Sequence, residues 1–165
     1  MKNMLRLAGV AVAGGLACWL WTVWFPSPEK QVLRQVARLA ATANFSAGDG
    51  NLTRAGKAGN LAGEFANDAE IVYEIAGLGG RTLDGREEIR EAALGAFANL
   101  TSLKVEFADA TARIGSDQQS GEVTCTARVS TGDSKDFGIQ ELRFQLKKSG
   151  GDWLITRAET VKTLQ

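Results

Sequence analysis

The sequence contains no histidine, and it has only two cysteines, two prolines and one tyrosine. Histidine is the commonest general base and a frequent metal ligand at neutral pH, so its absence removes the simplest routes to acid–base catalysis and to a metal centre. Cys18 lies within an apolar segment and Cys125 lies far from it in the chain, so no disulfide framework is expected. We therefore expect neither a metal nor another cofactor.

Excess positive charge is also lacking, because the chain has 19 basic and 19 acidic residues. Lys2 and Arg6 precede the apolar segment and every acidic residue follows it, so the rest of the chain has a small net negative charge. Proteins that bind nucleic acid present an excess of basic side chains to the phosphate backbone. The charge balance argues against nucleic acid as a partner.

One long apolar segment is present, at residues 7–25, and it contains no charged residue. As a helix with a rise of 1.5 Å per residue it would reach roughly 28 Å, close to the thickness of the hydrocarbon core of a bilayer. Trp19, Trp21 and Trp24 gather at its C-terminal end, where tryptophan favours the headgroup boundary, and Pro26 follows them. The pattern predicts a single membrane-spanning helix.

A cleaved signal peptide is the alternative, but bulky aromatic residues occupy the region where a cleavage site needs small ones. We expect residues 1–26 to form an uncleaved transmembrane signal anchor and residues 27–165 to form one folded domain. Basic residues flank the segment on both sides, so charge alone does not set the orientation. The short N-terminal tail favours a single-pass protein whose C-terminal domain is exported to a periplasmic or extracytoplasmic compartment.

Helices are predicted in the first half of the domain. One begins at Pro28, which suits the first helical position, and a second is indicated over residues 52–65 by apolar spacing. Asp84 and Glu87 form a capping-box pattern at the start of a third helix, which ends near Asn99.

Strands dominate the second half of the domain. A short strand is expected over residues 70–75, and alternating apolar residues predict four long strands over residues 103–114, 121–131, 137–148 and 152–162. The predicted helices come first in the chain and an antiparallel meander comes last. This order indicates an α+β domain in which the helices cover one face of a sheet.

The helix that opens over residues 83–89, the strand residues 141–144 and the Gly-x-Trp-x-Ile pattern of residues 151–155 together resemble the nuclear transport factor 2-like superfamily. SnoaL-like domains are the most similar subgroup, and the resemblance covers roughly residues 29–162. It implies a cone-shaped, curved, antiparallel-rich sheet covered by about three helices, with a pocket at the open end. Members include isomerases, cyclases, dehydratases and hydrolases as well as non-catalytic binding and assembly domains, so the fold alone does not select a function.

The last predicted strand supplies most of the ligand-pocket candidates. Strict alternation places Trp153, Ile155, Arg157 and Glu159 on one face, which would bring Arg157 and Glu159 beside the apolar core near the mouth of the cone. A carboxylate beside an arginine suits acid–base chemistry, but a structural ion pair is the plainer interpretation.

Tyr73 is a further pocket candidate, since it shares a strand face with Ile71 and Ile75. Isomerase-like members of the superfamily use a phenol to stabilise an enolate. A core tyrosine with its hydroxyl at the rim is the alternative interpretation.

Arg128, Glu141 and Arg143 alternate with apolar residues and should lie on the opposite face of the sheet. That face would be solvated, or buried in a homodimer or against other proteins of a membrane complex. Cys125 falls on the apolar side without a histidine partner, so we interpret it as a core residue.

These observations predict a membrane-tethered, non-catalytic binding or assembly module with a pocket for a small apolar ligand. The alternative is a small-molecule isomerase, cyclase or hydrolase of the SnoaL-like type. That enzyme would bring Glu159, Arg157 and Tyr73 together on an apolar cavity of at least about 300 Å³.

Overall fold

The computed structural model describes residues 26–75, 79–132 and 138–161, and only the backbone of residues 74, 75 and 79. Three helices and six strands follow one another in the order α2 (Pro28–Ala43), α3 (Asn51–Gly63), β1 (Phe65–Ile75), β2 (Gly79–Asp84), α4 (Gly85–Asn99), β3 (Leu103–Ile114), β4 (Ser120–Thr131), β5 (Gly138–Ser149) and β6 (Asp152–Thr160). Among these residues no helix is long and apolar enough to cross a membrane. The apolar segment 7–25 lies outside the described part of the chain.

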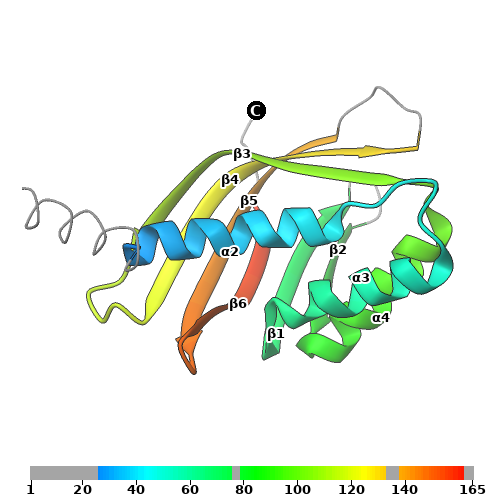
Figure 1. Ribbon diagram of the computed structural model, residues 1–165. Coiled ribbons are helices and arrows are strands. Elements are labelled where there is room, and N and C mark those ends of the chain that lie inside the picture. Colours follow the sequence, from blue (N-terminus) through cyan, green and yellow to red (C-terminus); the bar gives the residue numbers. More distant parts are fainter. Residues whose placement is uncertain (1–25, 76–78, 133–137, 162–165) are drawn as a thin grey trace, which may run out of the picture.

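The six strands form one curved sheet in the order β2-β1-β6-β5-β4-β3. Only β1 and β6 are parallel, and every other neighbouring pair is antiparallel. Helix α2 lies across one face of the sheet, while α3 and α4 pack on each other and close the side near β1 (Figure 1). The expected α+β domain with a curved, largely antiparallel sheet is confirmed.

Helix α2 packs by one apolar stripe. Pro28 stands in its first turn, and Val32, Val36 and Leu39 are buried at helical spacing against the sheet. From the sheet side, Val123, Phe144 and Ile155 complete the same core. Burying a side chain of this size contributes about 1.5–3 kcal/mol, so this stripe holds the helix on the sheet.

Two local predictions about the first half of the domain are wrong. Residue Phe65 does not end the second helix but opens β1, which starts five residues before the predicted strand. The capping box of the third helix also differs, because the carboxylate of Glu88, not of Glu87, accepts from the backbone N–H of Asp84 at 2.7 Å. Helix propensity and capping patterns carry no information about the tertiary contacts that decide where α3 ends and how α4 begins.

A β-bulge at Thr156 changes the faces of the last strand. Ile155 pairs with Leu146 and Arg157 pairs with Gln145, so Thr156 is an extra residue with no partner on β5. One extra residue moves every later side chain to the opposite face of the sheet. Ala158 therefore faces the core, and the prediction that Arg157 and Glu159 share the face of Trp153 and Ile155 is wrong.

Candidate functional site

An apolar cavity of about 230 Å³ lies between the helices and the sheet. Its helical wall comes from the C-terminal half of α2, with Leu39 and Ala43, and from Leu61 of α3. The sheet wall is built by residues of five strands: Phe65, Ile71, Val72, Tyr73, Val105, Phe107, Ala127, Val129, Leu142, Phe144, Ala158, Glu159 and Thr160. The cavity is the hollow of the cone that the family resemblance led us to expect.

Small side chains on the sheet make room for this cavity. Val123 on β4 and Ile155 on β6 face the core and fill the space under α2. Farther along the same two strands, the core-facing positions hold the smaller residues Ala127 and Ala158. The Phe107 and Phe144 rings meet with their centroids 5.5 Å apart and form one side of the cavity. The strand pattern thus fills one end of the cone and leaves the other end hollow.

The cavity wall is almost wholly apolar, and two of its lining residues, Tyr73 and Thr160, carry a hydroxyl group. Tyr73 alternates with Ile71 on the core face of β1, and Thr160 follows Ala158 on the same face of β6. Glu159 also borders the cavity, but its carboxylate is bound on the other side of the sheet. Of the three residues expected to converge, only the Tyr73 side chain faces the cavity.

The outer face of the sheet carries a network of ion pairs that includes Arg157 and Glu159. Arg157 Nε donates to Glu159 Oε2 at 3.1 Å, and Arg157 also pairs with Glu70 on β1. From β5, Arg143 Nη1 donates to Glu159 Oε1 at 3.2 Å, and its Nε lies 3.9 Å from Glu122 Oε2. These side chains are between 24% and 40% exposed, so water screens the pairs and the network is mainly a structural feature of this face.

The interface candidates lie on this outer face. Arg143 belongs to the ion-pair network, Glu141 is exposed beside Thr126, and Arg128 is exposed beside Glu106 on β3. A hydrogen bond from Lys104, together with the charges of Lys104 and Arg128, lowers the pKa of Glu106. No partner chain is present, so the role of these residues in an interface stays a prediction.

Trp153 lies away from the cavity. Its ring is 4% exposed and its indole Nε1–H donates to Gln31 Oε1 of α2 at 3.0 Å. It lines a separate open groove of about 610 Å³ between α2 and the β5–β6 turn. This groove is larger than the cavity, but charged and amide side chains line it.

Cys125 is a core residue, as predicted. The thiol is 5% exposed and packs in the main core cluster, where burial raises its pKa to about 11. At neutral pH it is protonated and therefore a poor nucleophile. In the described part of the chain, no group of histidine, cysteine or carboxylate side chains is arranged to hold a metal ion.

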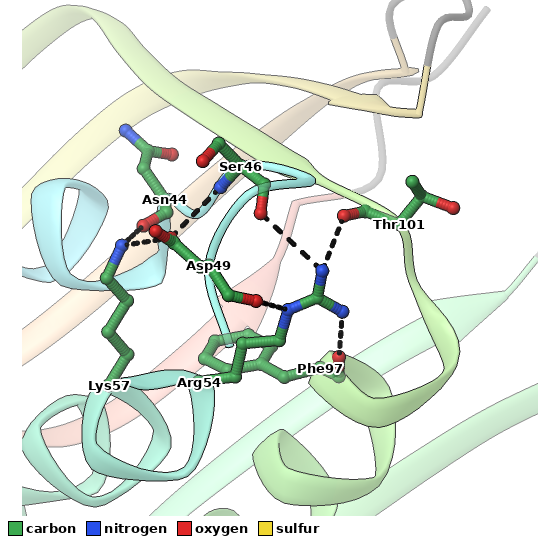
Figure 2. Close-up of polar contacts among 7 residues, drawn as sticks. All are labelled: Asn44, Ser46, Asp49, Arg54, Lys57, Phe97 and Thr101. Carbon is green, nitrogen blue, oxygen red and sulfur yellow. Dashed lines mark hydrogen bonds and ion pairs between the residues drawn. The ribbon is translucent and has the colours of Figure 1, made fainter. Parts of the chain in front are cut away.

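The sequence analysis did not recognise Arg54, which positions α3 at the cavity. Figure 2 shows its guanidinium reaching the backbone carbonyls of Ser46, Asp49, Phe97 and Thr101. The shortest bonds, at 2.9–3.0 Å, go to Asp49, to Thr101 and also to Leu100. The guanidinium also lies 4.9 Å from the centroid of the Phe45 ring. Arg54 therefore joins α3 to the C-terminal end of α4 and to the loop after α2.

Lys57, one turn later on α3, completes this connection. Its Nζ donates at 2.8 Å both to the carbonyl of Asn44 and to Asp49 Oδ2 (Figure 2). The Asp49 carboxylate also accepts a hydrogen bond from the backbone N–H of Ser46. The hydrogen bond from Lys57, which has the larger effect, and the one from Ser46 both lower the pKa of Asp49. The only available signal was that two basic residues stand on one face of a glycine-rich helix.

Comparison with known proteins identifies the fold. No protein-family model and no curated protein matches the sequence. An NTF2-like protein with a cystatin-like fold from Novosphingobium aromaticivorans superposes with a TM-score of 0.63 at 19% identity, covering 88% of this chain and 86% of that one. An NTF2-like protein of unknown function from Pseudomonas putida gives a TM-score of 0.65 at 13% identity, covering 86% and 90% of the two chains.

A candidate scytalone dehydratase from Novosphingobium aromaticivorans is also similar, with a TM-score of 0.60, 15% identity and coverage of 82% and 83%. At identities this low, the structural superpositions show a shared architecture but do not show a shared chemistry. The chain has the NTF2-like, cystatin-like fold.

Proposed function

We propose that this NTF2-like domain is a non-catalytic binding module whose conical cavity takes a small apolar ligand. The observation that carries the proposal is the cavity of about 230 Å³, whose exposed wall is almost wholly apolar although Tyr73, Thr160 and Glu159 are among its lining residues. Apolar pockets with one or two polar groups bind small molecules and orient them. Arg157 and Glu159 are engaged in ion pairs on the other face, so this charged pair does not face a bound molecule.

The cavity volume limits the size of the ligand. A dry apolar cavity of about 150 Å³ holds benzene, so this one suits a single substituted ring or a short acyl chain. Burying an aromatic ring removes about 150–250 Å² from water, which is worth about 4–6 kcal/mol. Dissociation constants between roughly a millimolar and tens of micromolar follow from that range.

An enzyme of the dehydratase or isomerase type is the second candidate, favoured by the presence of Tyr73 among the residues that line the cavity. Such an enzyme also needs a group that moves a proton, placed within hydrogen-bond reach of the substrate. The carboxylate of Glu159, which was the sequence-based choice, is bound by Arg143 and Arg157 instead. Turnover of the bound molecule that is lost in Tyr73→Phe would favour this second candidate.

The membrane tether belongs to the same proposal. Residues 1–26 would anchor the chain by one pass, because residues 7–25 are apolar and long enough to span the hydrocarbon core. The short N-terminal tail favours an exported domain. The outer face of the sheet, with Arg128, Glu141 and Arg143, would then be available to a second copy or to other proteins of the membrane.

The ligand proposal can be tested with the full-length chain in lipid nanodiscs. We expect 4-fluorotoluene to show saturable binding by fluorine NMR. Ala158→Leu and Ala43→Leu, which fill the cavity from the sheet and from α2, should abolish this binding. Ala110→Leu is the matched control, because Ala110 is exposed on β3 and does not line the cavity.

Partition of 4-fluorotoluene into the nanodisc lipid gives the same background signal for the wild type and the three variants. A difference between these proteins therefore reports binding to the chain. The thermal unfolding midpoint of each variant checks that the fold is intact. Saturable binding that survives in both filled variants would refute the proposal.

A further inference from the structure

The outer side of α2 is a basic surface that no other described element covers (Figure 1). Lys30, Arg34 and Arg38 recur every four residues, and Ala37 and Ala41, three residues after Arg34 and Arg38, lie on the same side of the helix. All five residues are exposed, whereas the opposite side of the helix is buried against the sheet. We call these five residues the basic face of α2.

The open groove of about 610 Å³ runs along this basic face. Arg34 and Arg38 line it from α2, and Asp152 on the β5–β6 turn is the one acidic residue in its lining. The hydrogen bond between Gln31 and Trp153 fixes the floor of the groove. Arg38 is partly neutralised by Glu64, 3.9 Å away, whereas Arg34 and Lys30 form no ion pair with another of the described residues.

The position of α2 in the chain makes a lipid surface its nearest neighbour. The apolar segment 7–25 ends three residues before Pro28, the first residue of the helix. Three residues of chain span at most about 10 Å. The N-terminal end of α2, where the basic face begins, is therefore close to the end of the apolar segment. A partner held so close is present at high effective concentration, whereas a soluble acidic protein or a second copy is not.

We propose that the basic face of α2 and the adjoining groove rest on anionic phospholipid headgroups of the membrane that anchors the chain. This inference depends on the proposed tether. Each lysine or arginine near an anionic surface contributes to binding, and Arg34 and Arg38 line an open groove of about 610 Å³ that has the volume for a phosphate headgroup. Leu39 and Ala43 of the same helix face the cavity, so this contact leaves the ligand site unobstructed.

The test uses the full-length chain in vesicles of phosphatidylcholine with or without phosphatidylglycerol. An environment-sensitive dye is attached at Ala37→Cys in a Cys18→Ala background, and spin-labelled lipid headgroups quench it on contact. Cys125 remains unlabelled because it is buried. The same dye at Ala110→Cys, on the exposed side of β3, reports a position away from the basic face.

We expect strong quenching at position 37, weak quenching at position 110, and dependence on phosphatidylglycerol. Lys30→Gln with Arg34→Gln should lower the ratio of docked to undocked chains roughly thirty-fold, while Arg81→Gln with Arg113→Gln, which removes the same charge elsewhere, should leave it unchanged. Equal quenching at positions 37 and 110, or quenching that ignores phosphatidylglycerol, would overturn the docking inference.

Alkaline carbonate extraction of the same vesicles separates this inference from the tether. A chain that resists extraction but shows equal quenching at both positions refutes the docking and leaves the tether intact. A chain that is extracted refutes the tether, and with it the proximity argument on which the docking inference depends.

Discussion

Replacing Arg54 by methionine should destabilise the domain more than any other single loss of charge at its surface. The guanidinium donates to the carbonyls of Asp49, Leu100 and Thr101 at 2.9–3.0 Å and lies 4.9 Å from the Phe45 ring centroid. The bonds to Asp49 and Leu100 are partly buried and the bond to Thr101 is exposed. Hydrogen bonds contribute about 1 kcal/mol each, and a cation over an aromatic ring about 0.5–1 kcal/mol. The expected loss is therefore about 3–4 kcal/mol, a large share of the stability of a domain this size.

Urea unfolding of the full-length chain in detergent micelles, followed by far-ultraviolet circular dichroism, measures this loss. The midpoint should fall while the slope against urea stays constant, since the surface exposed on unfolding does not change. Arg90→Met is the matched control: Arg90 pairs with Glu87 on the exposed side of α4, so its loss should cost at most about 0.5 kcal/mol.

Arg54→Lys separates the effect of charge from that of geometry. Lysine keeps the positive charge but lacks the planar fork that reaches several carbonyls at once, so this variant should recover less than half of the lost stability. A loss below about 1 kcal/mol in Arg54→Met would refute the reasoning. Full recovery in Arg54→Lys would show that charge alone accounts for the effect.

Three further predictions concern titration, thiol reactivity and the outer face. Hydrogen bonds from the N–H groups of Gln119 and Ser120 lower the pKa of Asp117 from 3.8, so its stabilisation is present above that value and is lost as the pH falls through the lowered pKa. The thermal midpoint of Asp117→Asn should therefore vary less between neutral and strongly acidic pH than that of the wild type. Burial that raises the Cys125 pKa to about 11 should make its reaction with a disulfide reagent at pH 8 much slower in the native state than in urea. Glu159→Gln should lower the thermal midpoint and leave fluorotoluene affinity unchanged, because its carboxylate lies outside the cavity.

Much of the architecture could be predicted from the sequence because hydrophobic periodicity reports burial directly. The structure begins the first helix at Pro28, and it confirms the last four strands to within two residues at each end. Of these, β4 and β5 pair without a register shift over ten residues, because regular alternation leaves little freedom in the register. The alanines on the sheet face, which leave the cavity hollow, carried no comparable signal.

The candidate site was predicted less well because one residue changed the faces of a strand. Alternation assumes an uninterrupted pleat, and the bulge at Thr156 breaks it. A signal existed in the sequence: Ala158 is the small apolar residue between two charges, and it falls three positions after Ile155 instead of two. That spacing is typical of a bulge. Regular alternation, however, accounted for Arg157 and Glu159 as an ion pair on one face equally well, so the sequence did not require a bulge.

Arg54 was missed for a different reason. Its partners are backbone carbonyls, distributed over residues 46–101, and backbone acceptors leave no trace in residue type. Contacts of this kind emerge only when helix α3, the end of α4 and the loop after α2 are placed together.

Native mass spectrometry of the full-length protein, extracted gently from its own host membrane, tests the central claim most directly. A ligand of the affinity expected here dissociates on dilution, so the sample carries 4-fluorotoluene in excess over its dissociation constant, and the account predicts one bound fluorotoluene mass per chain. The Ala158→Leu variant should lose that mass and the Ala110→Leu variant should keep it. A bare chain in every sample, or a small mass that Ala158→Leu retains, would contradict the assignment of the cavity as a ligand site.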